Sequence, residues 1–343
     1  MRTVNLNIIS RYRTELMGLC AIFILLCHAP GNNVIMPSAL SSILSLGGLG
    51  VDVFLFLSGL GLWYSLDKFY STEYPKLITP KSKTGGVILW YLRRYKRLLI
   101  TYLLVAIPYY AVFCIVKNLS LEKYLLYVST VGFWTEHQGI WFVDALIPIY
   151  ALSPLLYCAF NRSRHNAILA VSLIILCYVF CLIPNECVDS KISLLVNSQF
   201  VVVRLPSFIT GMWIAKYVKN GLALRTTTIV VMVIAFISLI IVFKVLHIPL
   251  ATSFFATIPL VSLMLLLCNC LRSGRVHNAL MFMGNISLES YIFNVTLHFF
   301  IPYISWDIAD YNISYGNYIP YLSILIVGTA LSYVLNRFVK MIV

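Results

Sequence analysis

The sequence predicts an all-α, polytopic membrane protein with about ten transmembrane helices. Its mean hydropathy is +0.89, and 60% of its residues are hydrophobic while only 11% are charged. Soluble globular chains carry about twice that fraction of charge. Apolar segments of about 20 residues, the length that a helix needs to cross a bilayer, recur along the whole chain. These segments are continuous rather than alternating, which favours helices over the strands of a membrane barrel.

We expect one membrane domain, residues 1–343, with both termini in the cytoplasm. The first segment follows Arg11 and Arg13 and is short enough to resemble a secretory signal. No small-x-small cleavage pattern follows it, so we interpret it as a retained helix. The predicted spans, in chain order, cover residues 14–29, 42–66, 98–116, 139–160, 167–183, 200–218, 228–246, 251–271, 279–303 and 319–338.

The positive charge of the chain follows its predicted topology. The formal net charge is +13, and roughly twenty Lys and Arg residues lie in the connections on one side, against four on the other. Such an asymmetry is typical of the cytoplasmic side of a membrane protein. We therefore expect a multi-pass protein of the cytoplasmic (inner) membrane and no nucleic-acid partner. The nine cysteines form no CxxC pair, which predicts core packing and no metal site.

Two adjacent spans each carry one ionisable residue near the same end. His28 ends the first span, just before Pro30, and Asp52 interrupts the apolar run of the second. Either residue alone could simply lie at the membrane interface, but the two together favour a functional site. Gly59 lies on the same helical face as Asp52 and would let another helix approach closely. We expect Asp52 to pair within the protein rather than to face lipid.

Three further ionisable residues fall at a similar predicted depth: Asp144, Arg204 and His298. They suggest a shared polar cavity, although Asp144 and Arg204 could also snorkel to the interface. Arg13 and His28 lie on one stripe of the first helix, about 22 Å apart along its axis. This stripe suits a long ligand that is anionic at the cytoplasmic end and reactive at the other end, as a coenzyme A thioester is.

Six segments in order along the chain resemble the acyltransferase 3 family of integral membrane acyltransferases, which modify surface polysaccharides and related acceptors. The family's first helix has Arg eleven residues before His, and this chain has Met17 at that position. Arg13, one turn earlier on the same stripe, is the candidate substitute. The segments that carry the resemblance are Leu16–His28, Gly48–Leu62, Tyr91–Leu99, Gly139–Leu156, Arg204–Gly211 and Gly284–Asn294.

The resemblance implies an O-acyltransferase that moves acetyl from acetyl-CoA to a hydroxyl of a surface polysaccharide or its lipid-linked precursor. An imidazole can take the proton of an attacking hydroxyl, so we expect catalysis by His28, with Asp52 orienting it. Acetyl-CoA would be a substrate rather than a tightly bound cofactor, and its phosphates would bind guanidinium groups. Other expected partners are the carbohydrate acceptor and membrane lipids, with no obligate protein partner. The predicted donor-binding residues are Arg13, Arg93, Arg94 and Arg97, and the predicted substrate-binding residues are Trp141, Arg204, Glu289 and His298.

The main alternative is a proton-coupled transporter or flippase of glycan intermediates, with a relay through Asp52, Glu289 and His28. Discontinuous helices and a two-fold hydropathy repeat would favour it, and the sequence shows neither clearly. A glycan polymerase is a second alternative, but the predicted external connections are all short.

Overall fold

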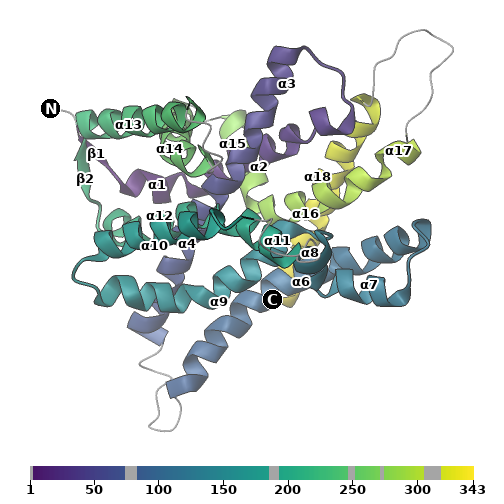
Figure 1. The fold of residues 1–343 in the computed structure, drawn as a ribbon, viewed down its shortest axis with the longest axis horizontal. Coiled ribbons are helices and arrows are strands. Elements are labelled where there is room, and N and C mark those ends of the chain that lie inside the picture. Colours follow the sequence, from purple (N-terminus) through teal and green to yellow (C-terminus); the bar gives the residue numbers. More distant parts are fainter. Residues whose placement is uncertain (1–2, 74–82, 185–192, 246–251, 271–273, 305–317) are drawn as a thin grey trace. The chain divides into compact units, whose positions relative to one another are not determined.

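The computed structural model describes residues 3–73, 83–184, 193–245, 252–270, 274–304 and 318–343 (Figure 1). Their contacts divide the chain into two compact units. Unit 1 comprises residues 1–12 and 52–265, and unit 2 comprises residues 13–51 and 266–343. Each unit is described by itself below. The predicted ends of the seventh and eighth spans, at residues 246, 251 and 271, lie outside the described residues.

The all-α membrane fold is confirmed. Within the described ranges, eight helices are long and apolar enough to cross a membrane. Of the other predicted spans, the fifth forms the shorter apolar helix Asn166–Cys181, and the ninth is divided at Ile286 into two helices. The eight spans are Arg13–Asn32, Ser38–Ser71, Val87–Val116, Trp141–Arg162, Leu194–Lys219, Thr226–Phe243, Ser253–Cys270 and Tyr318–Ile342.

Unit 1 is helical apart from two three-residue strands, which the sequence did not predict. The strands β1 and β2 pair antiparallel, with Thr3 opposite Arg225 (Figure 1). The first two residues of α4, Gly50 and Val51, and the end of α14 belong to unit 2. The elements are β1 (Thr3–Asn5), α1 (Asn7–Arg11), α4 (Gly50–Lys68), η3 (Phe69–Glu73), α6 (Lys83–Val116), α7 (Leu121–Val128), α8 (Val131–Glu136), α9 (Trp141–Arg162), α10 (Asn166–Cys181), α11 (Ser193–Val202), α12 (Leu205–Lys219), β2 (Ala223–Arg225), α13 (Thr226–Val245) and α14 (Thr252–Cys270).

Two glycines let α4 and α12 cross at close range in unit 1. A Cβ on Gly59 would lie 2.3 Å from the carbonyl oxygen of Phe208, and one on Gly211 would lie 2.0 Å from that of Phe56. Both distances are far inside van der Waals contact, so only glycine fits at either position. This confirms the close approach predicted at Gly59. The crossing holds Asp52, near the start of α4, against the start of α12.

Unit 2 is also helical, and a second glycine crossing joins its α2 and α15. A Cβ on Gly18 would lie 2.0 Å from the carbonyl oxygen of Leu280, and one on Gly284 would lie 1.9 Å from that of Thr14. The elements of unit 2 are α2 (Arg13–Cys27), η1 (Pro30–Asn32), α3 (Ser38–Ser45), η2 (Leu46–Leu49), α15 (Arg275–Asn285), α16 (Ser287–Leu297), η5 (His298–Phe300), α17 (Ile301–Ile304) and α18 (Tyr318–Ile342).

Large apolar side chains cover the exposed faces of several helices. In α13 none of the most apolar stretch is buried within the protein, and Val231 and Ile234 are 64% and 58% exposed. Soluble monomers rarely expose continuous apolar surfaces of this kind. The faces are instead suited to contact with lipid tails, as an integral membrane protein requires.

Candidate functional site

His28 lies in unit 2, directly after the last residue of α2, beside a second histidine. The ring centroids of His28 and His298 are 5.4 Å apart, in an edge-to-face arrangement. The His298 ring also stacks on that of Tyr321, again with centroids 5.4 Å apart. The side-chain amide of Asn32 donates to the carbonyl oxygen of His28 at 2.7 Å and fixes the turn that follows α2. The structure therefore brings together two of the predicted site residues, His28 and His298.

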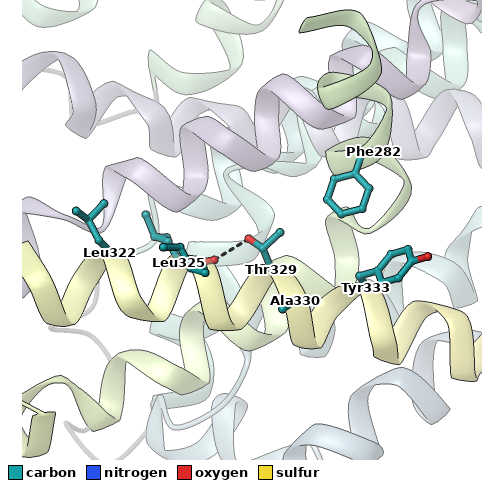
Figure 2. A pocket seen from close by; sticks show the side chains of 7 residues that line it. Phe282, Leu322, Leu325, Thr329, Ala330 and Tyr333 are labelled. Atoms are coloured by element: carbon teal, nitrogen blue, oxygen red, sulfur yellow. Dashed lines mark hydrogen bonds between the residues drawn. The ribbon is translucent and has the colours of Figure 1, made fainter. Parts of the chain in front are cut away.

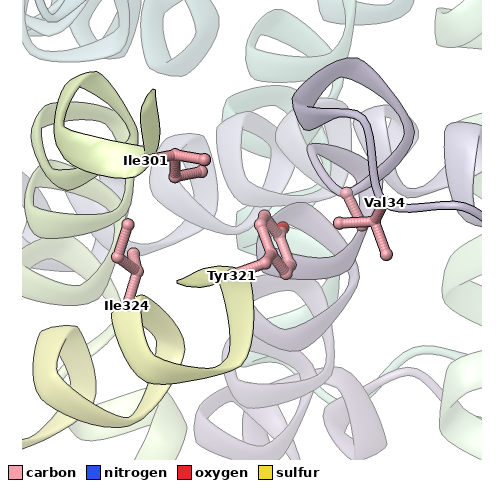
Figure 3. Close-up of a cluster of buried hydrophobic side chains, with 5 residues drawn as sticks. Val34, Ile301, Tyr321 and Ile324 are labelled. Carbon is pink, nitrogen blue, oxygen red and sulfur yellow. The ribbon is translucent and has the colours of Figure 1, made fainter. Parts of the chain in front are cut away.

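An apolar cluster supports this histidine pair. Tyr321 packs with Val34, Ile301 and Ile324, and all four are buried (Figure 3). The Tyr321 hydroxyl donates to the carbonyl oxygen of Leu25, in the last turn of α2. The ring on which His298 stacks is thus fixed both by packing and by a hydrogen bond. This arrangement limits the orientations open to the two imidazoles.

Asp52 lies in unit 1 and is fully buried. Its Oδ2 accepts a hydrogen bond from Nη1 of Arg204 at 2.7 Å, and its Oδ1 accepts one from the Ser207 hydroxyl at 3.2 Å. The Ser207 hydroxyl is also 3.0 Å from that of Thr257 on α14. The expectation that Asp52 pairs within the protein is confirmed. Its partners include Arg204, from the predicted substrate-binding set, together with Ser207 and Ser253.

Arg204 is also held by aromatic rings. Its guanidinium carbon lies 5.4 Å from the centroid of the Trp141 ring and 5.6 Å from that of Phe200, within the range of cation–π attraction. The side chain remains 20% exposed. Arg204 and Trp141, both predicted to bind substrate, are therefore neighbours. An arginine anchored in this way keeps further N–H donors for a ligand, because a guanidinium has five.

The predicted pairing of His28 with Asp52 joins a residue of unit 2 to a residue of unit 1 and stays a prediction. The predicted donor-binding residues are divided in the same way. Arg13 begins α2 in unit 2, whereas the other three lie on α6 in unit 1, with exposed side chains: Arg93, Arg94 and Arg97. Arg94 donates to the Ser65 hydroxyl, and its guanidinium carbon is 6.0 Å from the ring centroid of Trp90.

Two other ionisable side chains are almost fully buried. Glu289 on α16 accepts a 2.9 Å hydrogen bond from the amide of Asn336 on α18. Asp144 on α9 is 0% exposed, so it does not snorkel to an interface, and no described group hydrogen-bonds to either of its oxygens. A Cβ on Gly139 would lie 2.3 Å from Oδ2 of Asp144, so the glycine makes room for the carboxylate.

An apolar pocket of about 550 Å³ lies in unit 2, between α15 and α18 (Figure 2). The Thr329 hydroxyl in its lining donates to the carbonyl oxygen of Leu325 at 2.7 Å. The Tyr333 hydroxyl accepts from Nε of Arg337 at 3.2 Å. None of the predicted site residues lines this pocket. It offers apolar surface and no catalytic group, so it is not a candidate for the chemical site.

Sequence reasoning missed several polar residues near the predicted site residues. Ser207, Ser253 and Thr257 belong to the network around Asp52, and Ser290 and Asn294 lie on α16 between Glu289 and His298. The signal for the last two is present in the sequence, because Ser290, Asn294 and His298 follow one another at intervals of four within an apolar span. For Ser207 no such signal exists, since its partner Asp52 is distant in the chain.

The comparisons with known proteins identify the family. The comparisons with curated proteins and with solved structures give no match. A family model described as an acyltransferase domain, that of the acyltransferase 3 family, matches residues 16–337, nearly the whole chain. The match includes both the histidine pair and the Asp52–Arg204 pair. The chain therefore belongs to the acyltransferase 3 family and is a membrane acyltransferase.

Proposed function

We propose that the protein transfers an acetyl group from acetyl-CoA to a hydroxyl of a surface polysaccharide or of its lipid-linked precursor. The observation that supports this most directly is the position of His28. It ends an apolar membrane helix, next to a second imidazole, in a chain of an acyltransferase family. A histidine in that place is suited to moving a proton where little water is present.

The proposed reaction needs one base that later acts as an acid. A sugar hydroxyl is a poor nucleophile until its proton is removed, and His28 takes this proton as the oxygen attacks the thioester carbonyl carbon. A C–O bond forms and a tetrahedral intermediate results. When the intermediate collapses, the C–S bond breaks, and the imidazolium of His28 returns the proton to the leaving thiolate. The products are the O-acetyl ester and free coenzyme A.

Arginines would bind both ligands. Arg204, packed on Trp141 and Phe200, combines N–H donors with aromatic surface, which suits an oxygen-rich carbohydrate acceptor. Arg13, Arg93, Arg94 and Arg97 would bind the phosphates of coenzyme A, because guanidinium groups bind phosphate oxygens bidentately. In this proposal the acetyl-CoA phosphates stay at the basic end of the protein and only the neutral arm enters the membrane region.

Transport of glycan intermediates is the second candidate, and one observation favours it. The predicted ninth span is discontinuous, with a break at Ile286 between α15 and α16, and broken helices are common in transporters. Mass spectrometry of surface glycan from wild-type and deletion cells separates the two functions. Loss of an acetyl group from the deletion strain supports acyl transfer, whereas loss of the glycan itself supports transport.

Replacement of the proposed base tests the mechanism. We expect His28→Ala to lower the acetyl transfer rate by about 10² to 10⁴, the usual contribution of a general base. The matched control is His165→Ala, because His165 is an exposed histidine outside the membrane spans. Glycan acetylation is measured by mass spectrometry at equal membrane abundance of each protein. Acetylation by His28→Ala at the wild-type level would exclude His28 as the base.

A further inference from the structure

Helix α16 carries buried polar atoms that have no partner among the described residues. They are Oε2 of Glu289, Oγ of Ser290, and both Oδ1 and Nδ2 of Asn294. The three residues are 1%, 3% and 2% exposed, respectively. Buried polar groups are nearly always hydrogen-bonded, so these atoms need partners that the described residues do not supply. Four such atoms on one eleven-residue helix therefore point to a ligand.

Two of these residues form a stripe that leads to the proposed base. Ser290, Asn294 and His298 are spaced by four residues, so each is turned only about 40° from the previous one and lies about 6 Å further along the axis. The stripe ends at His298, whose ring contacts that of His28. Glu289 does not belong to it, because it is turned about 100° around the helix from Ser290, and its Oε1 accepts the hydrogen bond of Asn336 on α18. The stripe is thus neutral and runs toward the site of chemistry.

The chemistry of the stripe selects among the possible ligand groups. A hydroxyl and a carboxamide both donate and accept hydrogen bonds, and neither carries charge. A phosphate would require cations, and an acyl chain would leave the orphaned atoms unsatisfied. A sugar ring presents its hydroxyls close together rather than along a line of about 12 Å. A neutral, extended chain with amide groups several ångströms apart fits best.

We propose that Ser290 and Asn294 bind the two amide groups of the pantetheine arm of the acyl-CoA donor. Asn294, which is nearer to His298, binds the amide next to the thioester, and Ser290 binds the more distant amide. The thioester then lies at the His28–His298 pair. This inference rests on the proposed function, because it takes an acyl-CoA as the donor. It adds the residues that bind the donor's arm and the order in which they do so.

Entry of the arm requires α16 to move, because the orphaned atoms are buried. The break at Ile286 separates α16 from α15, which is held against α2 by Gly18 and Gly284. Residues at the end of a helix commonly serve as hinges. In the proposal, α15 stays fixed on α2 while α16 turns about Ile286 to admit the arm.

Binding of donors of different length to the purified full-length protein in lipid nanodiscs tests the inference. Acetyl-CoA and S-acetylpantetheine contain both amides, whereas S-acetyl-N-acetylcysteamine contains only the amide next to the thioester. We expect Asn294→Leu to weaken binding of all three by about 3- to 10-fold, the effect of one or two neutral hydrogen bonds. Ser290→Ala should weaken binding of acetyl-CoA and S-acetylpantetheine by a similar factor and leave the affinity for S-acetyl-N-acetylcysteamine unchanged.

A matched control lies on the opposite side of the same helix. The Thr296 hydroxyl is buried and donates to the carbonyl oxygen of Ile292 at 3.0 Å, so Thr296→Val should leave every donor affinity unchanged. Thermal unfolding without donor checks the fold. Ser290→Ala and Asn294→Leu remove only unpaired polar atoms and should melt no lower than wild type.

The outcomes separate this inference from the proposed function. If wild type binds acetyl-CoA and both variants bind it equally well, the stripe does not bind the arm, and the proposed function stands. If Ser290→Ala weakens binding of S-acetyl-N-acetylcysteamine as much as binding of acetyl-CoA, Ser290 does not bind the more distant amide and the proposed order of the two residues is wrong. If wild type binds none of the three thioesters, both proposals are overturned.

Discussion

At the scale of single residues, the two buried ionisable sites differ in how their groups are satisfied. Asp52 has a hydrogen bond to each oxygen and a cation beside it, whereas His298 keeps a buried Nε2 without a partner among the described residues. A fully bonded carboxylate is suited to holding other groups in place. An imidazole with an unused nitrogen is suited to exchanging a proton or binding a ligand. The histidine pair is therefore the better candidate for chemistry, and Asp52 for positioning.

Removal of either member of the Asp52–Arg204 pair is expected to destabilise the protein. Asp52 is 0% exposed and Arg204 is 20% exposed, and breaking a buried pair costs about 3–5 kcal/mol because one charge is left uncompensated. We expect Asp52→Asn and Arg204→Gln each to lower the melting temperature, and the double variant to lower it by less than the sum. Thermal unfolding in nanodiscs measures the coupling. Additive effects would contradict the pairing.

A more exposed ion pair in the same unit provides the control. Nζ of Lys219 lies 2.6 Å from Oδ2 of Asp67, and the Lys219 side chain is 55% exposed. Exposed pairs contribute only about 0–1 kcal/mol, so Lys219→Gln should change the melting temperature little.

The pH–rate profile of Asp52→Asn tests the other predicted role of Asp52, the orientation of His28. If the midpoint of this pH–rate profile shifts from that of wild type, Asp52 orients His28. If the midpoint is unchanged, Asp52 acts only by holding Arg204.

At the scale of elements, glycine crossings position both candidate sites. The crossing of α4 and α12 holds Asp52 near Arg204, and that of α2 and α15 fixes the helix that ends at His28. Small residues have this role in membrane proteins because close backbone approach replaces the hydrophobic driving force. The Gly59 crossing could be predicted because Gly59 lies on the same helical face as Asp52. The Gly18 and Gly284 crossing could not, because the two glycines are 266 positions apart in the sequence.

A methyl group at the second crossing is expected to force α2 and α15 apart. Gly18→Ala would place Cβ 2.0 Å from the backbone oxygen of Leu280. A backbone atom inside a helix cannot move aside as the end of a flexible side chain can. We expect a loss of about 1–3 kcal/mol of stability, the usual cost of overpacking, and reduced acyl transfer. Gly48→Ala is the control, because a Cβ there meets nothing within 4 Å. Equal melting temperatures for the two variants would contradict the close crossing.

At the scale of the whole molecule, the sequence was sufficient to predict the fold class, but it predicted only part of the candidate site. Continuous apolar segments predict membrane helices because every backbone group must be bonded within the membrane. The break at Ile286 escaped prediction, because a hydropathy window over residues 279–303 averages over the polar residues beside it, Asn285, Ser287 and Glu289. Contacts such as Asp52 with Ser207, 155 positions apart, depend on tertiary packing, which composition and periodicity do not encode.

The sidedness of the donor is the prediction that involves the whole chain. The basic connections predict which end of the protein faces the cytoplasm, and the sequence predicts that the arginines proposed to bind phosphate lie at that end: Arg13, Arg93, Arg94 and Arg97. Phosphates kept outside the apolar region avoid the cost of burying their charge. Inside-out vesicles supplied with external labelled acetyl-CoA should therefore label glycan, whereas sealed right-side-out vesicles should not.

The same assay tests the arginines themselves. Exchange of both Arg94 and Arg97 for Gln should raise the KM for acetyl-CoA in inside-out vesicles and leave the KM for the acceptor unchanged, because these arginines are proposed to bind the phosphates of the donor. The control exchanges Arg162 and Arg164 for Gln, since these lie at and just after the end of α9, are exposed, and belong to the same predicted cytoplasmic side. A general loss of surface charge would affect both double variants alike. Equal labelling in the two vesicle orientations would rule out a donor site reached only from the cytoplasm.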